Sequence, residues 1–194
     1  MSNITEMARS HYEKGVPYEI AEPETSLYQV LEETARFYPN RPATQYFGQE
    51  LTYSQLKTEV DRAANVLRLA GVRRGDAVSI ALPNCPQHVI VFYALMRIGA
   101  IAAEHNPLAP ISEIEQQIKR HRGKVAVVWE KSVSKFAFGP GHQLQTVFTV
   151  DITRYMPVTK KTMLALPIAP ARKARDQMRL AAPAGTLSWD DKVR

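Results

Sequence analysis

The segment GDAVSIALPNCP, residues 75–86, decides the fold. It places an apolar run at Val78–Leu82 directly before Asn84 and Pro86, which start a largely apolar helix. Short continuous apolar runs are typical of strands that are buried on both faces. Three more such runs follow, with helical patterns between the earlier ones, at Ile101–Ala103, Val125–Trp129 and Thr146–Val150. This alternation predicts an α/β fold, a layered and mostly parallel sheet with helices on both faces.

Side chains that bind the free N–H groups of a first helical turn predict where the helices start. The predicted caps are Ser26 with Gln29, Thr52 with Gln55, Asn84 alone, and Ser112 with Glu115. The apolar faces expected behind three of them are Leu27, Val30, Leu31 and Ala35; Leu56, Val60, Ala63, Leu67 and Ala70; and Ile111, Ile114, Ile118 and His121. Between the first two helices, strand patterns at Ala43–Phe47 and Glu50–Leu51 around Gly48-Gln49 predict a hairpin.

Composition excludes several classes of protein. The 194 residues are 45% apolar and 23% charged, which is ordinary for a globular domain. A single cysteine, Cys85, excludes an internal disulfide, and the absence of a second cysteine argues against a zinc site, so no metal site is expected. The acidic N-terminal segment has the features of neither a signal peptide nor a transit peptide, which favours a cytoplasmic protein.

The net charge of +6 is concentrated in one segment. Between Ile152 and Ala182 there are seven basic residues and one acid, which leaves eighteen basic and eighteen acidic residues elsewhere. A globally basic nucleic-acid binder is therefore disfavoured, and no nucleic-acid partner is expected. A local basic surface remains compatible with phosphate groups or an anionic membrane.

The basic segment has the pattern of two helices, at Val158–Leu166 and Ala171–Ala181, separated by a break at Pro167–Pro170. Arg172, Arg175 and Arg179 are expected to form one stripe of the second helix. Two interpretations stay open: an interfacial segment that lies on anionic lipid, and a solvated insertion that covers the domain edge. The candidate membrane contacts are Lys160, Lys161, Arg172, Lys173, Arg175 and Arg179.

One polar cluster, Glu104, His105 and Asn106, directly follows a predicted strand. In open parallel sheets ligands collect beyond the carboxyl ends of strands, so His105 or Glu104 is a candidate for proton transfer or substrate contact. The alternative makes Asn106-Pro107 a turn and His105 a hydrogen-bonded support. We favour this alternative, because no nucleophile or second carboxylate is identifiable beside the cluster.

Three other positions are weaker candidates. Cys85, near a helix start, is either a thiol of lowered pKa or, as we favour, a small buried residue. His121 is expected to pack at a helix end or to contact the last carbonyls. Gly139-Pro140-Gly141 is interpreted as a loop, because a proline between the glycines removes an amide that a phosphate site would use.

Several of these segments resemble one family, the adenylate-forming acyl-CoA synthetases. The matching stretches run in the family's order: Leu51-Thr52-Tyr53-Ser54-Gln55-Leu56, Gly75-Asp76-Ala77-Val78-Ser79-Ile80, Pro83-Asn84-Cys85-Pro86-Gln87, and Gly99-Ala100 through Asn106-Pro107-Leu108. The resemblance covers about Ser26 to Val150, and Tyr155-Met156-Pro157 with the basic helices looks like an insertion of bacterial long-chain fatty acid CoA ligases.

The resemblance implies an enzyme that activates a long-chain fatty acid with ATP and Mg²⁺ to an acyl-adenylate and then transfers the acyl group to coenzyme A. The family's phosphate loop, adenine segment, ribose-binding aspartate and C-terminal lysine have no counterpart here, so no catalytic residue is carried onto this chain. Fatty acyl-AMP ligases and aryl-acid ligases begin similarly and stay open as alternatives. A stand-alone membrane- or lipid-interacting scaffold domain is a further one.

The expected organisation has four parts. Residues 1–25 form an N-terminal extension, 26–151 an α/β subdomain, 152–182 the basic helical insertion, and 183–194 the start of a next, missing segment. On this interpretation the chain is an N-terminal fragment that is inactive alone and has the missing C-terminal part as a partner. Peripheral attachment to the inner face of the membrane is the expectation that follows from the lipid interpretation.

Overall fold

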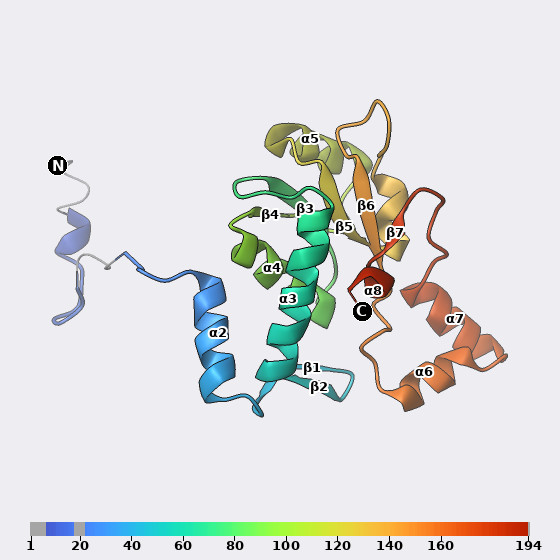
Figure 1. Cartoon of the computed structure of the whole chain (residues 1–194), viewed down its shortest axis with the longest axis horizontal. Helices are drawn as coiled ribbons and strands as arrows, with labels where there is room; N and C mark the ends of the chain where they lie inside the picture. The colour runs from blue at the N-terminus through green and yellow to red at the C-terminus, as the bar shows by residue number, and fades with distance from the viewer. Residues whose placement is uncertain (1–6, 18–21, 194) are drawn as a thin grey trace.

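A five-stranded parallel sheet forms the centre of the chain (Figure 1). The computed structural model describes residues 7–17 and 22–193. The strands are β3 (Ala77–Ala81), β4 (Ile101–Glu104), β5 (Val125–Trp129), β6 (Thr146–Val150) and β7 (Leu187–Ser188). They lie in the order β4-β3-β5-β6-β7, and every neighbouring pair is parallel. The four predicted strands and their direction are confirmed.

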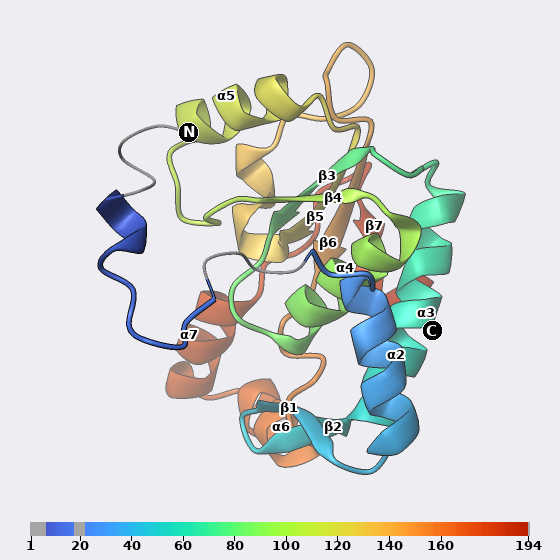
Figure 2. The same cartoon turned by 90° about the vertical axis from the view of Figure 1, so that its left-hand side faces the viewer.

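Helices cover both faces of this sheet, as expected. Figure 2 shows α2 (Leu27–Phe37), α3 (Tyr53–Leu69) and α4 (Pro86–Ile98) on one side and α5 (Ile111–His121) on the other. Two apolar cores result. The larger one joins Val78, Ile80 and Phe148 of the sheet to the first three helices, and the smaller one joins Ala126 and Val128 to α5 and the 3₁₀ turn η1 (Glu130–Lys135).

The N-terminal hairpin packs against α3 and α4 and forms one wall of the cavity described below. Strands β1 (Pro42–Tyr46) and β2 (Gln49–Thr52) pair antiparallel, with Tyr46 opposite Gln49. The turn is therefore Phe47-Gly48, one residue earlier than predicted, and both of its residues have positive φ, 51° and 88°. A two-residue turn of this kind matches the twist of the strands. The predicted face of α2 was also partly wrong, because Tyr28, Leu31 and Ala35 are buried whereas Leu27 and Val30 are half exposed.

Two of the predicted helix caps are confirmed and two were wrong. Ser26 and Thr52 each form a reciprocal capping box with the glutamine three residues on. By contrast, α4 begins after Cys85 and α5 after Pro110, and neither helix has a side-chain cap. Proline in the first turn of α4 needs no N–H partner, so this helix starts there without the expected Asn84 bond.

The C-terminal part returns to the sheet. Helices α6 (Val158–Ala165) and α7 (Ala169–Met178) project from its lower end in Figure 1, and β7 with α8 (Trp189–Lys192) then closes the edge beside β6. Trp189 is 1% exposed and its ring meets that of Phe148 edge-on. Helix α7 differs from the prediction: it begins before Pro170, which occupies its first turn, and ends at Met178, so Arg179 lies beyond it. The predicted divisions at residues 25, 151 and 182 stay predictions, and residues 1–6 and 18–21 of the expected extension lie outside the described residues.

Candidate functional site

The carboxyl ends of the parallel strands meet at one edge of the sheet, where doubly wound folds bind ligands. Polar side chains lie at or shortly after the end of each strand. They include Glu104 as the last residue of β4 and His105 after it, Glu130 after β5, Asp151 after β6 and Asp190 after β7. Asn84 follows β3 by three residues. This edge is the candidate functional region of the chain.

The predicted cluster at residues 104–106 does not converge on one point. The Glu104 carboxylate lies 3.1 Å from Nε2 of His88, in the first turn of α4. His105 is buried and turns towards the sheet, where its Nε2 lies 3.0 Å from the Ser79 hydroxyl. Asn106 Oδ1 accepts the backbone N–H of Leu108 and so forms a turn. These three side chains therefore have three different sets of partners, two of them within the scaffold.

His88 is a polar residue that the sequence reasoning missed. Its partner Glu104 is sixteen residues away and on another element, so no local spacing pattern predicts that the two side chains pair. The hydrogen bond to Glu104 raises the pKa of His88, because the carboxylate favours the charged form of the ring.

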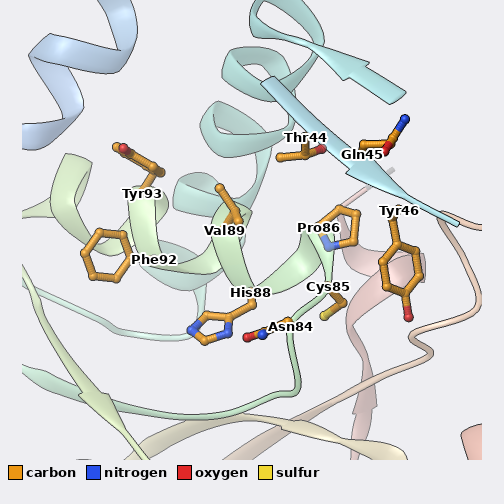
Figure 3. A pocket seen from close by; sticks show the side chains of 10 residues that line it. All are labelled: Thr44, Gln45, Tyr46, Asn84, Cys85, Pro86, His88, Val89, Phe92 and Tyr93. Atoms are coloured by element: carbon orange, nitrogen blue, oxygen red, sulfur yellow. The ribbon is translucent and has the colours of Figure 1, made fainter. Parts of the chain in front are cut away.

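The cavity beside His88 has a volume of about 490 Å³ (Figure 3). It lies between β1 and the first turns of α4, and Figure 3 shows Tyr46, Pro86 and Phe92 around it. The Cys85 thiol lines it too, and burial raises the pKa of this thiol to about 11. The alternative of a lowered thiol pKa was therefore wrong, because the charged thiolate loses hydration at this position.

Three carboxylates gather at the ends of β5, β6 and β7. Asp190 accepts hydrogen bonds from the Asp151 backbone N–H and from Gln87 Nε2, at 3.1 and 3.4 Å. Burial, with a smaller repulsion from Asp151, raises the pKa of Asp190 to about 6. Burial and the Asp151 charge likewise raise the pKa of Glu130. No group of three or more His, Cys, Asp or Glu side chains in the described ranges is arranged to hold a metal ion.

The basic residues predicted as membrane contacts divide into two groups. Lys160, Lys161, Arg172 and Lys173 are exposed on α6 and α7. Arg175 donates to the Leu164 carbonyl, 3.1 Å away, and Arg179 pairs with Asp151 at 3.2 Å. The expected stripe of Arg172, Arg175 and Arg179 was therefore wrong, because the helix ends before Arg179 and two of the three guanidinium groups point to the chain itself.

The remaining candidates from the sequence, His121 and the loop at Gly139, make hydrogen bonds within the fold. His121 ends α5 and packs there against His105, which is the first of its two expected roles; its Nδ1 accepts the Gly123 N–H and its Nε2 faces Ser79. Gly139 donates its N–H to the Leu144 carbonyl and Pro140 has none, so this loop does not fit a nucleotide phosphate. No helix in the described part of the chain is both long and apolar enough to cross a bilayer.

A family profile described as "AMP-binding enzyme" matches residues 31–181. The chain belongs to this family of AMP-binding enzymes. It is 28% identical to a long-chain-fatty-acid–CoA ligase of Bacillus subtilis over 81% of this chain and 28% of that protein. It is 32% identical to a long-chain-fatty-acid–CoA ligase of Yersinia pestis, over 77% of this chain and 25% of that protein. The chain therefore spans about a quarter of the length of these AMP-binding relatives.

Solved structures agree with the fold of an AMP-binding enzyme. The anthranilate CoA ligase AuaEII, in complex with anthranoyl-AMP, matches 88% of this chain with 28% of its own at a TM-score of 0.68 and 20% identity. A fatty acyl CoA synthetase of Mycobacterium tuberculosis matches 66% of this chain with 27% of its own, at a TM-score of 0.58 and 23% identity. These likenesses show the fold, whereas the family match over residues 31–181 confirms the resemblance found in the sequence.

Proposed function

We propose that the chain is part of an acyl-CoA ligase that activates long-chain fatty acids. The reaction joins ATP, fatty acid and coenzyme A into acyl-CoA, AMP and pyrophosphate through an acyl-adenylate. The observation that carries the proposal is the family match over residues 31–181, together with relatives that are long-chain-fatty-acid–CoA ligases. ATP, Mg²⁺ and coenzyme A are the cofactors of the whole enzyme.

The role proposed for these residues themselves is that of a scaffold. The carboxylates at the strand ends already have partners within the chain: Glu104 pairs with His88, Asp151 with Arg179, and Asp190 accepts a hydrogen bond from Gln87. The loop at Gly139 does not fit a phosphate. We therefore expect the chain alone to form no acyl-adenylate.

The activity is tested on the native protein. An antibody raised against the 194-residue chain captures the protein from its own cells, and the captured material is supplied with ATP, Mg²⁺, coenzyme A and palmitate. Palmitoyl-CoA formation supports the proposal. Palmitoyl-AMP without use of coenzyme A indicates an acyl-AMP ligase, aryl-CoA from benzoate indicates an aryl-acid ligase, and no product with any acid contradicts all three. The purified recombinant chain, assayed alongside, is expected to give no product.

A second candidate function is attachment to an anionic membrane through α6 and α7. The cations Lys160, Lys161, Arg172 and Lys173 share this pair of helices with exposed apolar side chains, namely Val158, Met163, Leu166 and Ile168. A basic surface with apolar side chains suits a layer of anionic headgroups, and each cation near it contributes about 1 kcal/mol. Attachment there would place the enzyme beside its fatty acid, at the inner face of the membrane.

Vesicle co-sedimentation tests this attachment. The chain is expected to bind vesicles that contain phosphatidylglycerol and not vesicles of phosphatidylcholine alone. Replacing Lys160, Lys161, Arg172 and Lys173 by Gln is expected to abolish binding. The matched control replaces Lys119, Arg120, Arg122 and Lys124 by Gln, which removes the same charge from another exposed face. Equal loss of binding in both variants contradicts a specific role for α6 and α7.

A further inference from the structure

Three consecutive residues at the end of β5 hold the C-terminal end of α7. The Trp129 indole Nε1–H donates to the Met178 carbonyl at 2.8 Å. The Lys131 ammonium donates to the Asp176 carbonyl, and a Glu130 carboxylate oxygen accepts the Leu180 backbone N–H at 3.4 Å. The last carbonyls of a helix lack partners within it, so Trp129 and Lys131 satisfy groups that otherwise need water.

Arg179 adds an ionic contact to the same place. Its guanidinium lies 3.2 Å from Asp151 and 3.7 Å from Glu130, and so joins the ends of β6 and β5. The Glu130 side chain is only 10% exposed, whereas that of Arg179 is 47% exposed. A poorly hydrated carboxylate depends on its cation more than an exposed one does. The Arg179 contact is therefore the part of this attachment that a single substitution can weaken while the apolar core stays intact.

Helices α6 and α7 have few buried residues, whereas the residues before and after this pair of helices are buried. No residue of α6 is buried, and in α7 only Ala171 is. Before this segment, Ile152 and Met156 are buried, and after it Trp189 is. Residues 157–186 therefore form a strap between two anchored ends, and the attachment at the end of β5 fixes its middle. Few buried apolar contacts are what a locally opening unit needs.

The strap also lies near the point of the sheet where the strand order reverses. In the order β4-β3-β5-β6-β7, successive strands are added on opposite sides of β3, so the strand order reverses between β3 and β5. Open sheets of this order take ligands at the carboxyl end of that reversal. Glu130 directly follows β5, so the end of α7 lies over one side of this position.

We propose that residues 157–186 act as a hinged strap that Arg179 holds closed on Glu130 and Asp151, and that opens as a unit to uncover the carboxyl ends of β5 and β6. The sheet stays folded when the strap opens, because β6 and α8 keep their own buried contacts. The proposal is independent of the reaction catalysed and of membrane attachment.

Hydrogen exchange with R179Q tests the strap, and R172Q, at an exposed arginine of α7, is the matched control. In R179Q the amides of α7 are expected to exchange roughly ten-fold faster, since the ion pairs with Asp151 and the poorly hydrated Glu130 are lost and ten-fold corresponds to about 1.4 kcal/mol. Peptides of β5 and β6, and all peptides of R172Q, are expected to match wild type. Unchanged exchange in α7, or equally faster exchange in β5 and β6, overturns the proposal.

Tryptophan fluorescence gives a second readout. The chain has two tryptophans, and since Trp189 is 1% exposed, quenching by acrylamide reports mainly on Trp129. Quenching is expected to increase in R179Q and not in R172Q. If R179Q fails to fold, E130Q, which keeps the shape of the side chain, must show the same local increase in exchange and quenching. A folded E130Q that behaves as wild type overturns the proposal.

Discussion

The Ser79 hydroxyl lies 3.0 Å from Nε2 of His105, at the centre of a directed chain of hydrogen bonds. Gly123 N–H donates to His121 Nδ1, so the proton of neutral His121 is on Nε2, which donates to Ser79 at 3.2 Å. Ser79 then donates to His105, whose Nδ1–H donates to Gln117 at 2.6 Å. Burial lowers the pKa of both histidines, which favours the neutral rings that this chain of hydrogen bonds requires.

The first prediction concerns this serine. Ser79→Ala leaves the buried His105 Nε2 without the hydroxyl and is expected to lower the free energy of unfolding by about 1 to 3 kcal/mol at pH 7.5. Ser112→Ala is the control, because Ser112 is exposed and caps nothing, and a change within about 0.5 kcal/mol is expected there. Urea unfolding measures both. Equal stability of the two variants would show that the chain of hydrogen bonds contributes nothing to the fold.

The second prediction concerns Asp190. Its folded pKa of about 6 lies above the unfolded value near 3.8, so its ionised form costs stability above pH 6, and the cost disappears as the pH falls towards 4. Asp190→Asn is therefore expected to stabilise the chain by about 1 to 3 kcal/mol at pH 7.5 and to leave it unchanged near pH 4.

Urea unfolding of wild type and Asp190→Asn at both pH values measures this difference. Glu33→Gln, an exposed carboxylate on α2, is the control and is expected to change stability little at either pH. A destabilised Asp190→Asn at pH 7.5 would mean that the ionised form is the one the fold prefers.

The third prediction separates a true helix cap from an apparent one. Thr52→Ala removes a side chain that accepts the Gln55 N–H and is expected to cost about 1 kcal/mol. Asn84→Ala is expected to stay within about 0.5 kcal/mol of wild type, because α4 begins after Cys85 and Asn84 is exposed. Thermal and urea unfolding measure both. A larger cost at Asn84 would restore the cap that the sequence alone predicts.

These caps show what a sequence can predict about this fold. Ser26 and Thr52 are recognised because both partners of a capping box lie three residues apart, and the four longer strands because each is a short run of mostly apolar residues. Strand β7 has two residues and too short a pattern to recognise. Helix α5 begins after Pro110, whose ring fixes φ, and no side chain caps it. A capping pattern in the sequence therefore does not locate its first residue.

The candidate site was less predictable than the fold, because its contacts join distant segments. His88 and Glu104, like Arg179 and Asp151, meet only after the sheet has assembled. Arg179 fitted the spacing of a helical stripe with Arg172 and Arg175, yet it lies beyond the last residue of α7. A periodic pattern gives the face of a helix and does not give the residue at which the helix ends.

The fourth prediction uses the single cysteine. Since burial raises the pKa of Cys85 to about 11, its thiolate fraction at pH 8 is small. Reaction with a disulfide reagent at pH 8 is expected to be slower than in the urea-unfolded chain, where the pKa is near 8.5, by roughly a hundred-fold. Similar rates in the two states would contradict the burial of this thiol.

The last prediction is that one substitution, Arg to Gly, has opposite effects at two positions, inside α5 and at the residue that follows it. Arg122 ends the helix with a φ of 57°, a conformation that costs energy for any residue with a side chain and none for glycine. Arg122→Gly is therefore expected to stabilise the chain by about 0.5 to 1 kcal/mol. Arg120 lies inside the same helix, where Gly costs about 1 kcal/mol, so Arg120→Gly is expected to destabilise it. Both residues are exposed and carry the same charge, so urea unfolding of the pair separates the backbone effect from the loss of charge. If both variants lose stability equally, the left-handed conformation of Arg122 does not cost the energy that this prediction assumes.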